Sequence, residues 1–583
     1  MMAFVADNMA PIMFASLVVF LLLGFPVAFS LAAVGLFYAI VGIDLGLFQE
    51  NFLQALPQRT YGVMANETLL AIPFFTFMGL ILERSGMAED LLDTIGQLFG
   101  PVRGGLAYAV VFVGALLAAT TGVVAASVIS MGLISLPIML RYGYDRRVAC
   151  GVIAASGTLA QIIPPSLVLI VMADQLGRSV GDMYSGAFVP GLLLAGMYAG
   201  YVFLVSMVRK DAAPALPPEA RAIREDNGSS GVLSLLVMVA LVIAGTYGFE
   251  VLLRSWAPGW AHQNEFILAS SLAILVAYII ASANRLLKLG ILSRLAESVI
   301  IVMVPPLALI FLVLGTIFLG IATPTEGGAM GATGALILAL AKRQLSFSLL
   351  VQALDQTAKL SAFVMFILIG ARVFSLTFYG VNGHRWVENL LIGLPGGAVG
   401  FLIVVNILVF FLAFFLDFFE LAFIVVPLLA PAASALGIDL IWFGVMLSVN
   451  MQTSFMHPPF GFSLFYLRSV APARPYTDRV TGKVMEGIRT GQIYWGAIPF
   501  VVIQCIMIGL IIAFPKLVLH YRTEPMDASK VQIEMPSLDT FGLPGLGAPS
   551  TAPAPGAPGT APAAPPRDTS LPPPIDLGPP PKF

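Results

Sequence analysis

The chain has 583 residues, of which 58% are hydrophobic and only 11% are charged, with a formal net charge of −2 and a mean hydropathy of +0.93. This composition excludes the soluble globular classes, which need more charged surface, and indicates a helical protein that crosses a membrane many times. The sequence has no Walker A loop, dinucleotide-binding glycine motif or nucleophile elbow, which argues against an ATP-driven pump and against a hydrolase.

Apolar runs long enough to cross a hydrocarbon layer of about 30 Å recur from the N-terminus to Pro515. The first run has no basic segment before it and is too long for a cleavable signal peptide, so it is predicted to be a span. The predicted spans are 10–23, 26–42, 65–83, 146–176, 183–208, 231–252, 266–283, 299–320, 325–341, 356–376, 440–470 and 491–516. The predicted fold class is all-α and polytopic, with about 12 spans.

Two further apolar stretches, 105–140 and 397–436, each fit either a pair of spans or a re-entrant hairpin that enters and leaves the membrane on one side. Cytoplasmic loops collect Lys and Arg, and five basic clusters fall on one side only if both stretches are hairpins. Both termini then lie on the outer side of the membrane. The clusters are Arg141, Arg146 and Arg147; Arg209 and Lys210; Arg285, Lys288 and Arg294; Lys342 and Arg343; and Arg474, Arg479, Lys483 and Arg489.

Two segments of the chain repeat each other at an offset of 294 positions (458 − 164). Asp145 corresponds to Asp439, and the pair Pro164–Pro165 corresponds to the pair Pro458–Pro459. An odd number of predicted crossings separates the copies, so they face opposite sides of the membrane. Inverted repeats that each carry a broken apolar helix are typical of secondary transporters.

The predicted spans 231–252 and 266–283 have no partner in the repeat, so we expect them to form an inserted helical hairpin. The end of the chain is rich in Pro, Ala and Gly and cannot bury enough apolar surface to fold, which predicts a disordered tail. The predicted divisions are a first repeat (1–210), an insertion with cytoplasmic loops (211–298), a second repeat (299–520) and the tail (521–583).

The first repeat breaks a helix at membrane depth, between Ser156-Gly157-Thr158 and Pro164-Pro165-Ser166. Proline has no N–H, so carbonyl groups one turn earlier lose their partners. Free carbonyls and hydroxyls are suitable ligands for Na⁺, and the helix that starts near Pro165 points its positive end into the break, where an anion can rest. A purely structural kink is the alternative interpretation.

The matching break in the second repeat runs from Asn450 to Pro459 and contains Gln452, Thr453 and Ser454. It also contains His457, whose ring is either a proton relay or, as is more common for a single histidine, a packed and hydrogen-bonded side chain.

The tips of the two hairpins carry further polar groups. The first tip contains Thr120, Thr121 and Gly122, and the second contains Asp417 and Glu420 in an otherwise apolar run. Carboxylates inside a membrane indicate a functional site. The alternative is that this tip reaches the headgroups, where both acids are solvated.

A fourth interruption, Thr323-Pro324-Thr325, is followed by Glu326, which is placed to cap the next helix. Gly327, Gly331 and Gly334 behind it have spacings that let helices pack closely. Arg372 lies deep in a predicted span, where it can pair with a carboxylate or face the substrate.

Four motifs together resemble a known family. They are GTLAQIIPPS (157–166), TPTE (323–326), FLDFFE (415–420) and HPPFGF (457–462). This set is similar to the large membrane subunit of the TRAP transporters, the DctM type, over residues 1–520. The insertion and the FLDFFE tip resemble the branch often labelled mannitol/chloroaromatic or α-keto acid transport.

The resemblance implies an import permease of the bacterial inner membrane and not an enzyme. It implies uptake of a small organic anion, such as a carboxylate, driven by a Na⁺ gradient, without an organic cofactor. It also implies an elevator mechanism, in which two hairpins and two broken helices slide against a scaffold. The implied partners are a four-helix membrane subunit of the DctQ type and a periplasmic binding protein of the DctP type.

The candidate residues fall into three groups, and the two acids of the second tip are either both cation ligands or divided between cation and substrate. The predicted Na⁺ ligands are Thr120, Gly122, Ser156, Gly157, Thr158, Asp417, Glu420, Asn450, Gln452 and Thr453. The predicted substrate contacts are Thr121, Ser166, Arg372, Phe418 and His457. The predicted helix breaks are at Pro164, Pro165, Thr323, Pro324, Thr325, Pro458 and Pro459.

A Na⁺- or H⁺-coupled transporter of the same fold that works without a soluble receptor is the close alternative. A channel or an intramembrane enzyme is a more distant one, and no Ser/His/Asp spacing in this sequence supports the enzyme.

Overall fold

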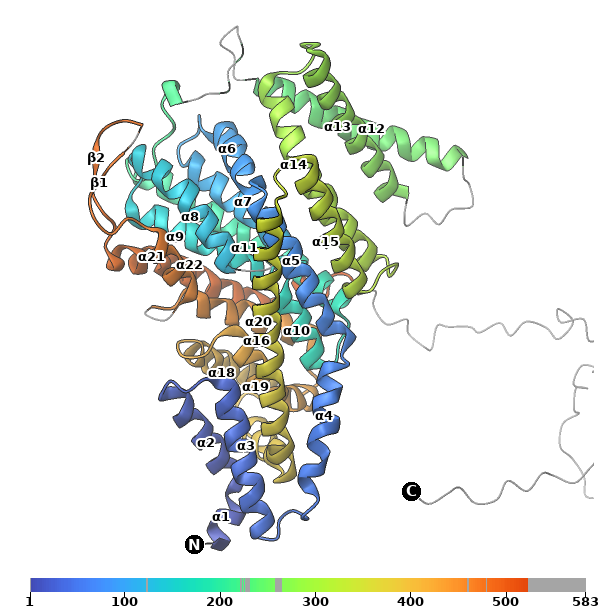
Figure 1. Ribbon diagram of the computed structural model, residues 1–583, viewed down its shortest axis with the longest axis vertical. Coiled ribbons are helices and arrows are strands. Elements are labelled where there is room, and N and C mark those ends of the chain that lie inside the picture. The colour runs from blue at the N-terminus through green and yellow to red at the C-terminus, as the bar shows by residue number, and fades with distance from the viewer. Residues whose placement is uncertain are drawn as a thin grey trace, which may run out of the picture. The chain divides into compact units, whose positions relative to one another are not determined.

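The chain folds almost entirely into α-helices, which Figure 1 shows in the computed structural model. The structure describes residues 2–121, 124–220, 223, 225, 231–256, 265–458, 461–478 and 480–522. Residues Met1–Arg522 form one unit by their contacts. The predicted tail, 521–583, lies outside the described residues from Thr523 onward.

Eight helices among the described residues are long and apolar enough to cross a membrane, or up to 10 if each of two bent helix pairs is one span. This confirms an all-α polytopic protein. The eight are α3 (Val27–Asp44), α11 (Val180–Val208), α12 (Val232–Trp256), α13 (Glu265–Leu287), α14 (Arg294–Phe318), α16 (Phe347–Gly380), α19 (Phe418–Ala435) and α22 (Thr490–Ala513). The first bent pair is Phe52–Met64 with Glu67–Arg84, at 45°, which contain α4 (Ala55–Met64) and α5 (Ala71–Arg84). The second is α17 (Gly383–Ile392) with α18 (Gly397–Leu412), at 116°.

Four predicted spans are not among these helices. The predicted span 10–23 is the 14-residue helix α2 (Met9–Leu22), and 325–341 is α15 (Pro324–Ala341), whose first half is rich in glycine and therefore less apolar. The predicted spans 146–176 and 440–470 are each divided into shorter helices. Their pieces are α9 (Arg146–Thr158) and α10 (Leu167–Leu176), and α20 (Leu440–Gln452) and α21 (Phe462–Val470).

The helix bounds follow the repeat that the sequence predicts. α9 and α20 each have 13 residues, and both their first and their last residues are 294 positions apart. The same offset relates α8 (Val124–Arg141) to α19. The two aspartates that the repeat aligns are both N-caps, since Asp145 accepts from the N–H of Arg147 and Asp439 accepts from the N–H of Ile441.

Packing between the repeats is reciprocal. α8 of the first repeat contacts α21 of the second, and α19 of the second contacts α10 of the first. Likewise α3 packs against α16, while α15 packs against α5. Each repeat therefore completes its core with helices of the other, as a two-fold relation between them requires.

Small residues allow these helices to pack closely. A Cβ atom on Gly35 of α3 would lie 2.9 Å from the backbone of Phe374 on α16. On α15, a Cβ on Gly331 would lie 2.4 Å from Sδ of Met78, and one on Gly334 would lie 2.3 Å from Leu309. The prediction that the glycines after Glu326 serve helix packing is confirmed.

The predicted insertion is a pair of contacting helices, α12 and α13, which also contact α14. The three helices share a small apolar cluster that includes Met238, Ala277 and Ile300. Much of the remaining surface of α12 and α13 is apolar and exposed, which suits a lipid environment.

Two short amphipathic helices, α6 (Met87–Phe99) and α17, are not predicted from the sequence, because each carries charged residues on one face. Nor is a small antiparallel hairpin, β1 (Tyr476–Thr477) and β2 (Val484–Met485), in the loop between α21 and α22. The remaining helices are α1 (Met2–Asp7), α7 (Gly105–Thr121) and α23 (Lys516–Leu519).

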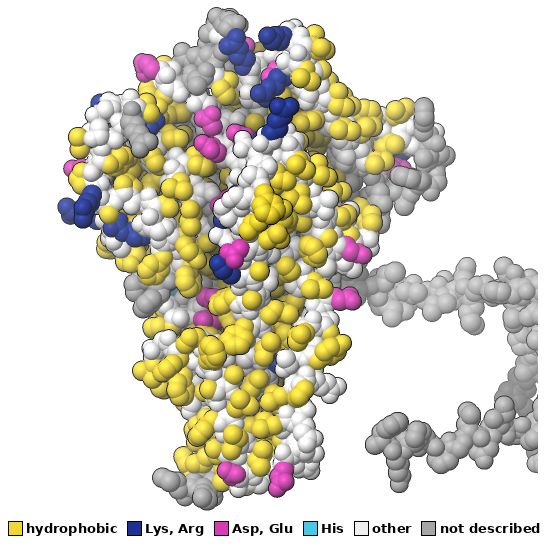
Figure 2. All heavy atoms as spheres, viewed as in Figure 1, with side chains coloured by type: hydrophobic (Ala, Val, Ile, Leu, Met, Phe, Trp, Pro, Cys, Tyr) yellow, Lys and Arg dark blue, Asp and Glu magenta, His cyan; other side chains and the backbone are white. Residues whose placement is uncertain are grey.

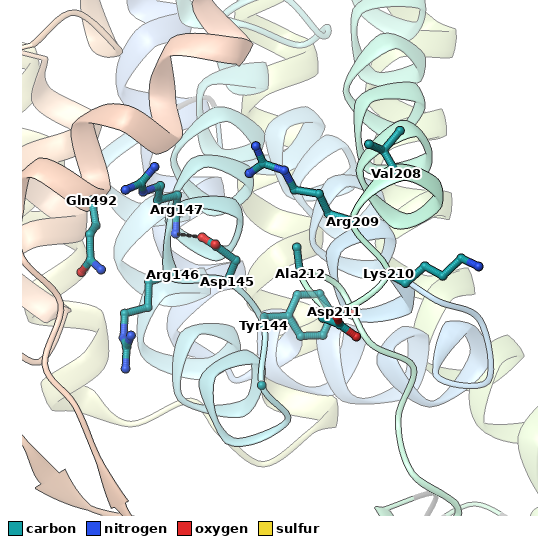
Figure 3. A pocket seen from close by; sticks show the side chains of 11 residues that line it. Tyr144, Asp145, Arg146, Arg147, Val208, Arg209, Lys210, Asp211, Ala212 and Gln492 are labelled. Carbon is teal, nitrogen blue, oxygen red and sulfur yellow. Dashed lines mark hydrogen bonds between the residues drawn. The ribbon is translucent and has the colours of Figure 1, made fainter.

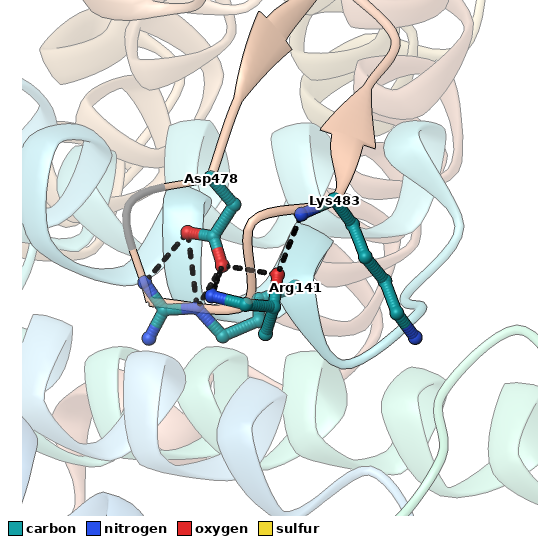
Figure 4. A network of polar contacts seen from close by, with 4 residues as sticks. Arg141, Asp478 and Lys483 are labelled. Atoms are coloured by element: carbon teal, nitrogen blue, oxygen red, sulfur yellow. Dashed lines mark hydrogen bonds and ion pairs between the residues drawn. The ribbon is translucent and has the colours of Figure 1, made fainter.

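An ion pair beside this β-hairpin joins the two repeats (Figure 4). Arg141, at the end of α8, donates from Nε and Nη2 to the carboxylate of Asp478 at 3.0 Å and 2.9 Å. The hydroxyl of Thr481 donates to the same carboxylate at 2.6 Å. These donors, Arg141 first, hold the pKa of Asp478 well below its usual range.

This pKa predicts a specific acid dependence of stability. The pair should contribute fully above the pKa of an unfolded aspartate, about 3.9, and its contribution should be lost as the pH falls through the lower folded value. Asp478→Asn should therefore lower the thermal unfolding midpoint at neutral pH and show a smaller additional loss on acidification, as measured by intrinsic fluorescence. Asp355→Asn, which removes the exposed pair with Lys359, is the control and should change neither quantity. An unchanged midpoint for Asp478→Asn at neutral pH would contradict the prediction.

Candidate functional site

Two interrupted helices from the two repeats form the centre of the candidate site. α9 passes into the short 3₁₀ turn η3 (Leu159–Gln161), and α20 passes into the equivalent turn η5 (Thr453–Phe455). Irregular backbone leads from η3 to α10, and the described residues 456–458 after η5 are also irregular. Pro164, Pro165 and Pro458 lie in these interruptions, and Pro459 lies outside the described residues.

Serine hydroxyls bridge both gaps. In the first break, Ser166 donates to the carbonyl of Gln161 at 2.6 Å and caps α10 by accepting from the N–H of Leu169 at 3.4 Å. In the second, Ser463 donates to the carbonyl of Phe455 at 2.5 Å. These bonds satisfy part of the backbone that each break leaves without a partner.

The two breaks meet through residues that the repeat aligns with each other. The side-chain amide of Gln452 donates to the hydroxyl of Thr158 at 3.0 Å, and these positions are 294 residues apart, which is the repeat offset itself. Two equivalent positions can touch only close to the axis that relates them. The Thr158–Gln452 hydrogen bond therefore marks the place where the broken helices cross, and both side chains are fully buried.

A second buried amide lies beside this contact. Asn450 donates from Nδ2 to both the backbone carbonyl and the side-chain oxygen of Asn406, each at 2.8 Å. Asn406 of α18 is not among the predicted site residues, although a single amide in the apolar run FLIVVNILVFF is a signal that could have identified it.

Several buried polar atoms around the breaks have no hydrogen-bond partner among the described residues. Five of these atoms are oxygens, from Ser156, Gln161, Asn450, Gln452 and Ser454. Buried oxygens normally have partners, so a cluster of unpartnered ones indicates a place for an ion, water or a polar ligand. Neutral oxygen ligands suit Na⁺, and neither Lys nor Arg lies within residues 156–167 or 450–462 of this sequence.

The first hairpin lies directly against this cluster. α7 approaches α9 so closely that a Cβ atom on Gly114 would lie 2.6 Å from Cβ of Ser156. The side chains of Thr120 and Thr121, and all of Gly122, lie outside the described residues. Gly157 faces the other arm of the hairpin, where its Cβ would lie 2.3 Å from Val128.

At the second hairpin tip, Asp417 and Glu420 form a reciprocal cap at the start of α19. Glu420 accepts from the N–H of Asp417 at 2.9 Å, and Asp417 accepts from the N–H of Glu420 at 2.8 Å. Both residues are half-buried rather than fully solvated. Each carboxylate has a second oxygen that this cap does not use.

His457 is a packed ring. It is only 1% exposed, stacks on Phe414 at 4.1 Å between ring centroids and contacts the edge of Phe410 at 4.5 Å. Neither ring nitrogen makes a hydrogen bond of ordinary geometry to a described residue, so the expected hydrogen bonds are not found. Phe418 is also 1% exposed and packs against Phe419.

Two predicted features lie on other helices. Thr323 and Glu326 cap α15 reciprocally, which confirms the predicted capping role, and Thr325 donates to the carbonyl of Glu67 at 2.7 Å. Arg372 lies on α16 within electrostatic range of Tyr379. Among the described residues Arg372 makes no hydrogen bond or ion pair.

Comparison with known proteins identifies a family match over most of the chain. Residues 14–289 and 249–517 match the family described as "Tripartite ATP-independent periplasmic transporter, DctM component". A C4-dicarboxylate TRAP transporter large permease protein of Pseudomonas aeruginosa is 28% identical over 425 residues, which cover 73% of this chain and 82% of that protein. The sialic acid large permease protein SiaM of Vibrio cholerae is 24% identical, covering 85% of this chain and 94% of that protein. The isethionate permease protein DctMQ of Oleidesulfovibrio alaskensis is 24% identical, covering 81% and 62%.

The crossing contact predicts a measurable coupling between the repeats. Thr158→Val should destabilise the protein by about 1–3 kcal/mol, because the amide of Gln452 then stays buried without an acceptor. Combining it with Gln452→Leu should recover part of this loss, so a double-mutant cycle on the unfolding free energy should show coupling of about 1 kcal/mol. Thr246→Val, which removes a buried hydroxyl bonded only to Val242 of its own helix, is the matched control. Additive effects of the two site variants would show that the contact does not join the breaks.

Proposed function

The chain belongs to the DctM component family of the tripartite ATP-independent periplasmic transporters, and from this premise we propose that it is the large permease subunit of a system that imports a small organic anion with a Na⁺ gradient. Its relatives are permease subunits, so the chain is a transporter subunit and not an enzyme. The observation that carries the Na⁺ proposal is the group of buried, unpartnered oxygens around two crossing helix breaks.

In the proposed cycle, Na⁺ binds first and occupies this oxygen group. Ser156, Asn450 and the nearby carbonyl ends of α9 and α20 are the proposed ligands, together with the hairpin-tip residues predicted above. The ion orders the tips against the breaks. The anion then rests near the positive end of α10, and the two charges partly cancel.

Movement of the loaded site across the membrane is proposed to follow an elevator mechanism. An uncompensated charge would cost about 2.3 kcal/mol per 100 mV of opposing membrane potential, in addition to desolvation. Compensation by Na⁺ removes most of this cost. In this proposal residues 1–210 and 299–520 are the inverted repeats and 211–298 is the insertion.

The proposed location is the bacterial inner membrane, with the basic loops in the cytoplasm and both termini in the periplasm. In Figure 2, most of the Lys and Arg side chains on the visible face lie in the upper half, whereas the lower end carries acidic side chains, and this supports the proposed orientation. The proposed partners are a small four-helix subunit of the DctQ type and a periplasmic binding protein of the DctP type. A relative named DctMQ, which is longer than this chain, supports the first of them.

Na⁺ binding is testable without knowing the substrate. A bound ion stabilises the folded protein by about 1.4 kcal/mol at ten times its dissociation constant, so NaCl should raise the thermal midpoint of the purified protein above that in choline chloride or KCl. Asn450→Leu should reduce this increase, and Ser206→Ala, which removes a hydroxyl bonded to Phe203 of its own helix, should not. Equal midpoints in NaCl and KCl would overturn the Na⁺ assignment, and a response to pH alone would favour the H⁺-coupled alternative.

The reciprocal caps of α15 and α19 allow capping to be separated from cation binding. Asp417→Asn and Glu420→Gln retain good capping groups but remove the charge, so both should raise the Na⁺ concentration for half-maximal stabilisation by about tenfold or more if they bind Na⁺. Glu326→Gln makes the same change in the equivalent cap at Thr323 and should leave the Na⁺ requirement unchanged. If all three variants behave alike, the acids of the second tip are caps only.

Dependence on a soluble receptor distinguishes the tripartite system from the stand-alone alternative. Proteoliposomes that contain the permease and its membrane partner should take up a C4-dicarboxylate or sialic acid probe, the compounds named for two relatives, only when the cognate binding protein is present. Full uptake without any binding protein would favour the stand-alone transporter.

A further inference from the structure

A basic cavity lies at the end of α9 that is remote from the helix break (Figure 3). Its volume is about 940 Å³, and it lies between the start of α9, the end of α11 and the start of α22. The rise along α9 separates it from the break by about 18 Å, so it is not part of the candidate transport site. The lining residues are Gly143, Tyr144, Asp145, Arg146, Arg147, Val208, Arg209, Lys210, Asp211, Ala212 and Gln492.

The cavity holds more cationic groups than its acids neutralise. Asp145 is engaged as the N-cap of α9, and Arg146 pairs with Glu486 at 3.1 Å. Among the described residues, the side chains of Arg147, Arg209 and Lys210 make no hydrogen bond or ion pair. Figure 3 shows the Arg209 side chain extending toward α9, with the Asp211 carboxylate well away from its guanidinium. Two guanidinium groups in one cavity repel each other unless an anion lies between them.

The walls of the cavity are fixed rather than loosely assembled. The N–H of Asp145 donates to the carbonyl of Ala212 at 2.9 Å, which ties the end of α11 to the start of α9. α22 packs against α9 so closely that a Cβ atom on Gly496 would lie 2.2 Å from the carbonyl oxygen of Arg147. The backbone positions that carry these cations are therefore set before any ligand binds, which lowers the cost of binding.

Apolar side chains at the cavity place it at the membrane surface. Val208, the last residue of the α11 span, is 80% exposed. A smaller adjoining hollow shares Arg147 and Gln492, adds Arg489 and is lined by Trp495, which is 64% exposed. Tryptophan is enriched where apolar spans meet the headgroups, and basic pockets between membrane helices bind anionic headgroups.

We propose that this cavity binds the phosphodiester headgroup of an anionic phospholipid, such as phosphatidylglycerol. Arg147 and Arg209 would hold the phosphate, while Val208 and Trp495 would lie beside the acyl chains. A free phosphate ion offers the same charge but cannot use the exposed apolar side chains, so the combination favours a lipid. Guanidinium groups suit this role because they bind phosphate oxygens in a bidentate manner.

Native mass spectrometry of the purified full chain in detergent tests the proposal. On titration with phosphatidylglycerol, the double variant Arg147→Gln/Arg209→Gln should bind its tightest lipid about 30-fold more weakly than the wild type, at about fivefold for each lost cation. The double variant Arg103→Gln/Arg285→Gln removes two exposed basic residues that do not line the cavity, and it should bind like the wild type. Phosphatidylcholine should show no difference among the three proteins.

Further measurements show whether a loss of lipid binding results from the missing cations or from unfolding of the variant. Arg147→Lys/Arg209→Lys retains both charges and should recover much of the binding, and the thermal midpoint of each variant checks that it is folded. Wild-type affinity for phosphatidylglycerol in a folded glutamine variant would overturn the proposal. So would complete displacement of the lipid by an equal concentration of inorganic phosphate, since the site would then be one for a free anion.

Discussion

The structure depends on one constraint: a helix that stops inside an apolar environment must find partners for the backbone groups it releases. α9 and α20 stop within the buried core, and serine hydroxyls and amide side chains supply only part of what is missing. Each broken helix is completed by the other, through Thr158 and Gln452. The remaining unpartnered oxygens are neutral and close to this contact, so they can receive a cation without first losing a strong internal ion pair.

The reciprocal caps of α15 and α19 have the same pattern of hydrogen bonds but differ in charge. Thr323 with Glu326 and Asp417 with Glu420 make the same pair of hydrogen bonds, at the starts of α15 and α19. The first uses a hydroxyl and one carboxylate, and the second uses two carboxylates within a hairpin tip. A neutral residue would cap α19 nearly as well as Asp417, so capping alone does not require the second negative charge. The second negative charge at this hairpin tip is therefore the feature that supports the proposal of a cation site there.

The sequence alone is sufficient to predict those features of the fold that depend on the residues of a single segment. Helix positions, the offset of 294 and the breaks at the proline pairs follow from hydropathy, alignment and the missing N–H groups of proline. What could not be predicted depends on contacts between distant segments. The meeting of Thr158 with Gln452 and the partnership of Asn406 with Asn450 result from how helices cross. The amphipathic helices α6 and α17 were not predicted, because their charged residues resemble the composition of a loop when only membrane-spanning apolar runs are sought.

Reciprocal packing also bears on how the proposed elevator would move. α8 contacts α21, α10 contacts α19, and Arg141 pairs with Asp478, so contacts between the repeats alternate across the boundary that separates them. Parting the repeats would break all of these contacts at once, whereas moving the broken helices and hairpins as one body would keep them. A body that moves in this way carries its binding site through the low-dielectric layer, and no Lys or Arg lies within residues 156–167 or 450–462 to balance an anion. In the proposed cycle a co-transported cation would supply the balancing charge, because the neutral oxygens at the break are suited to hold one.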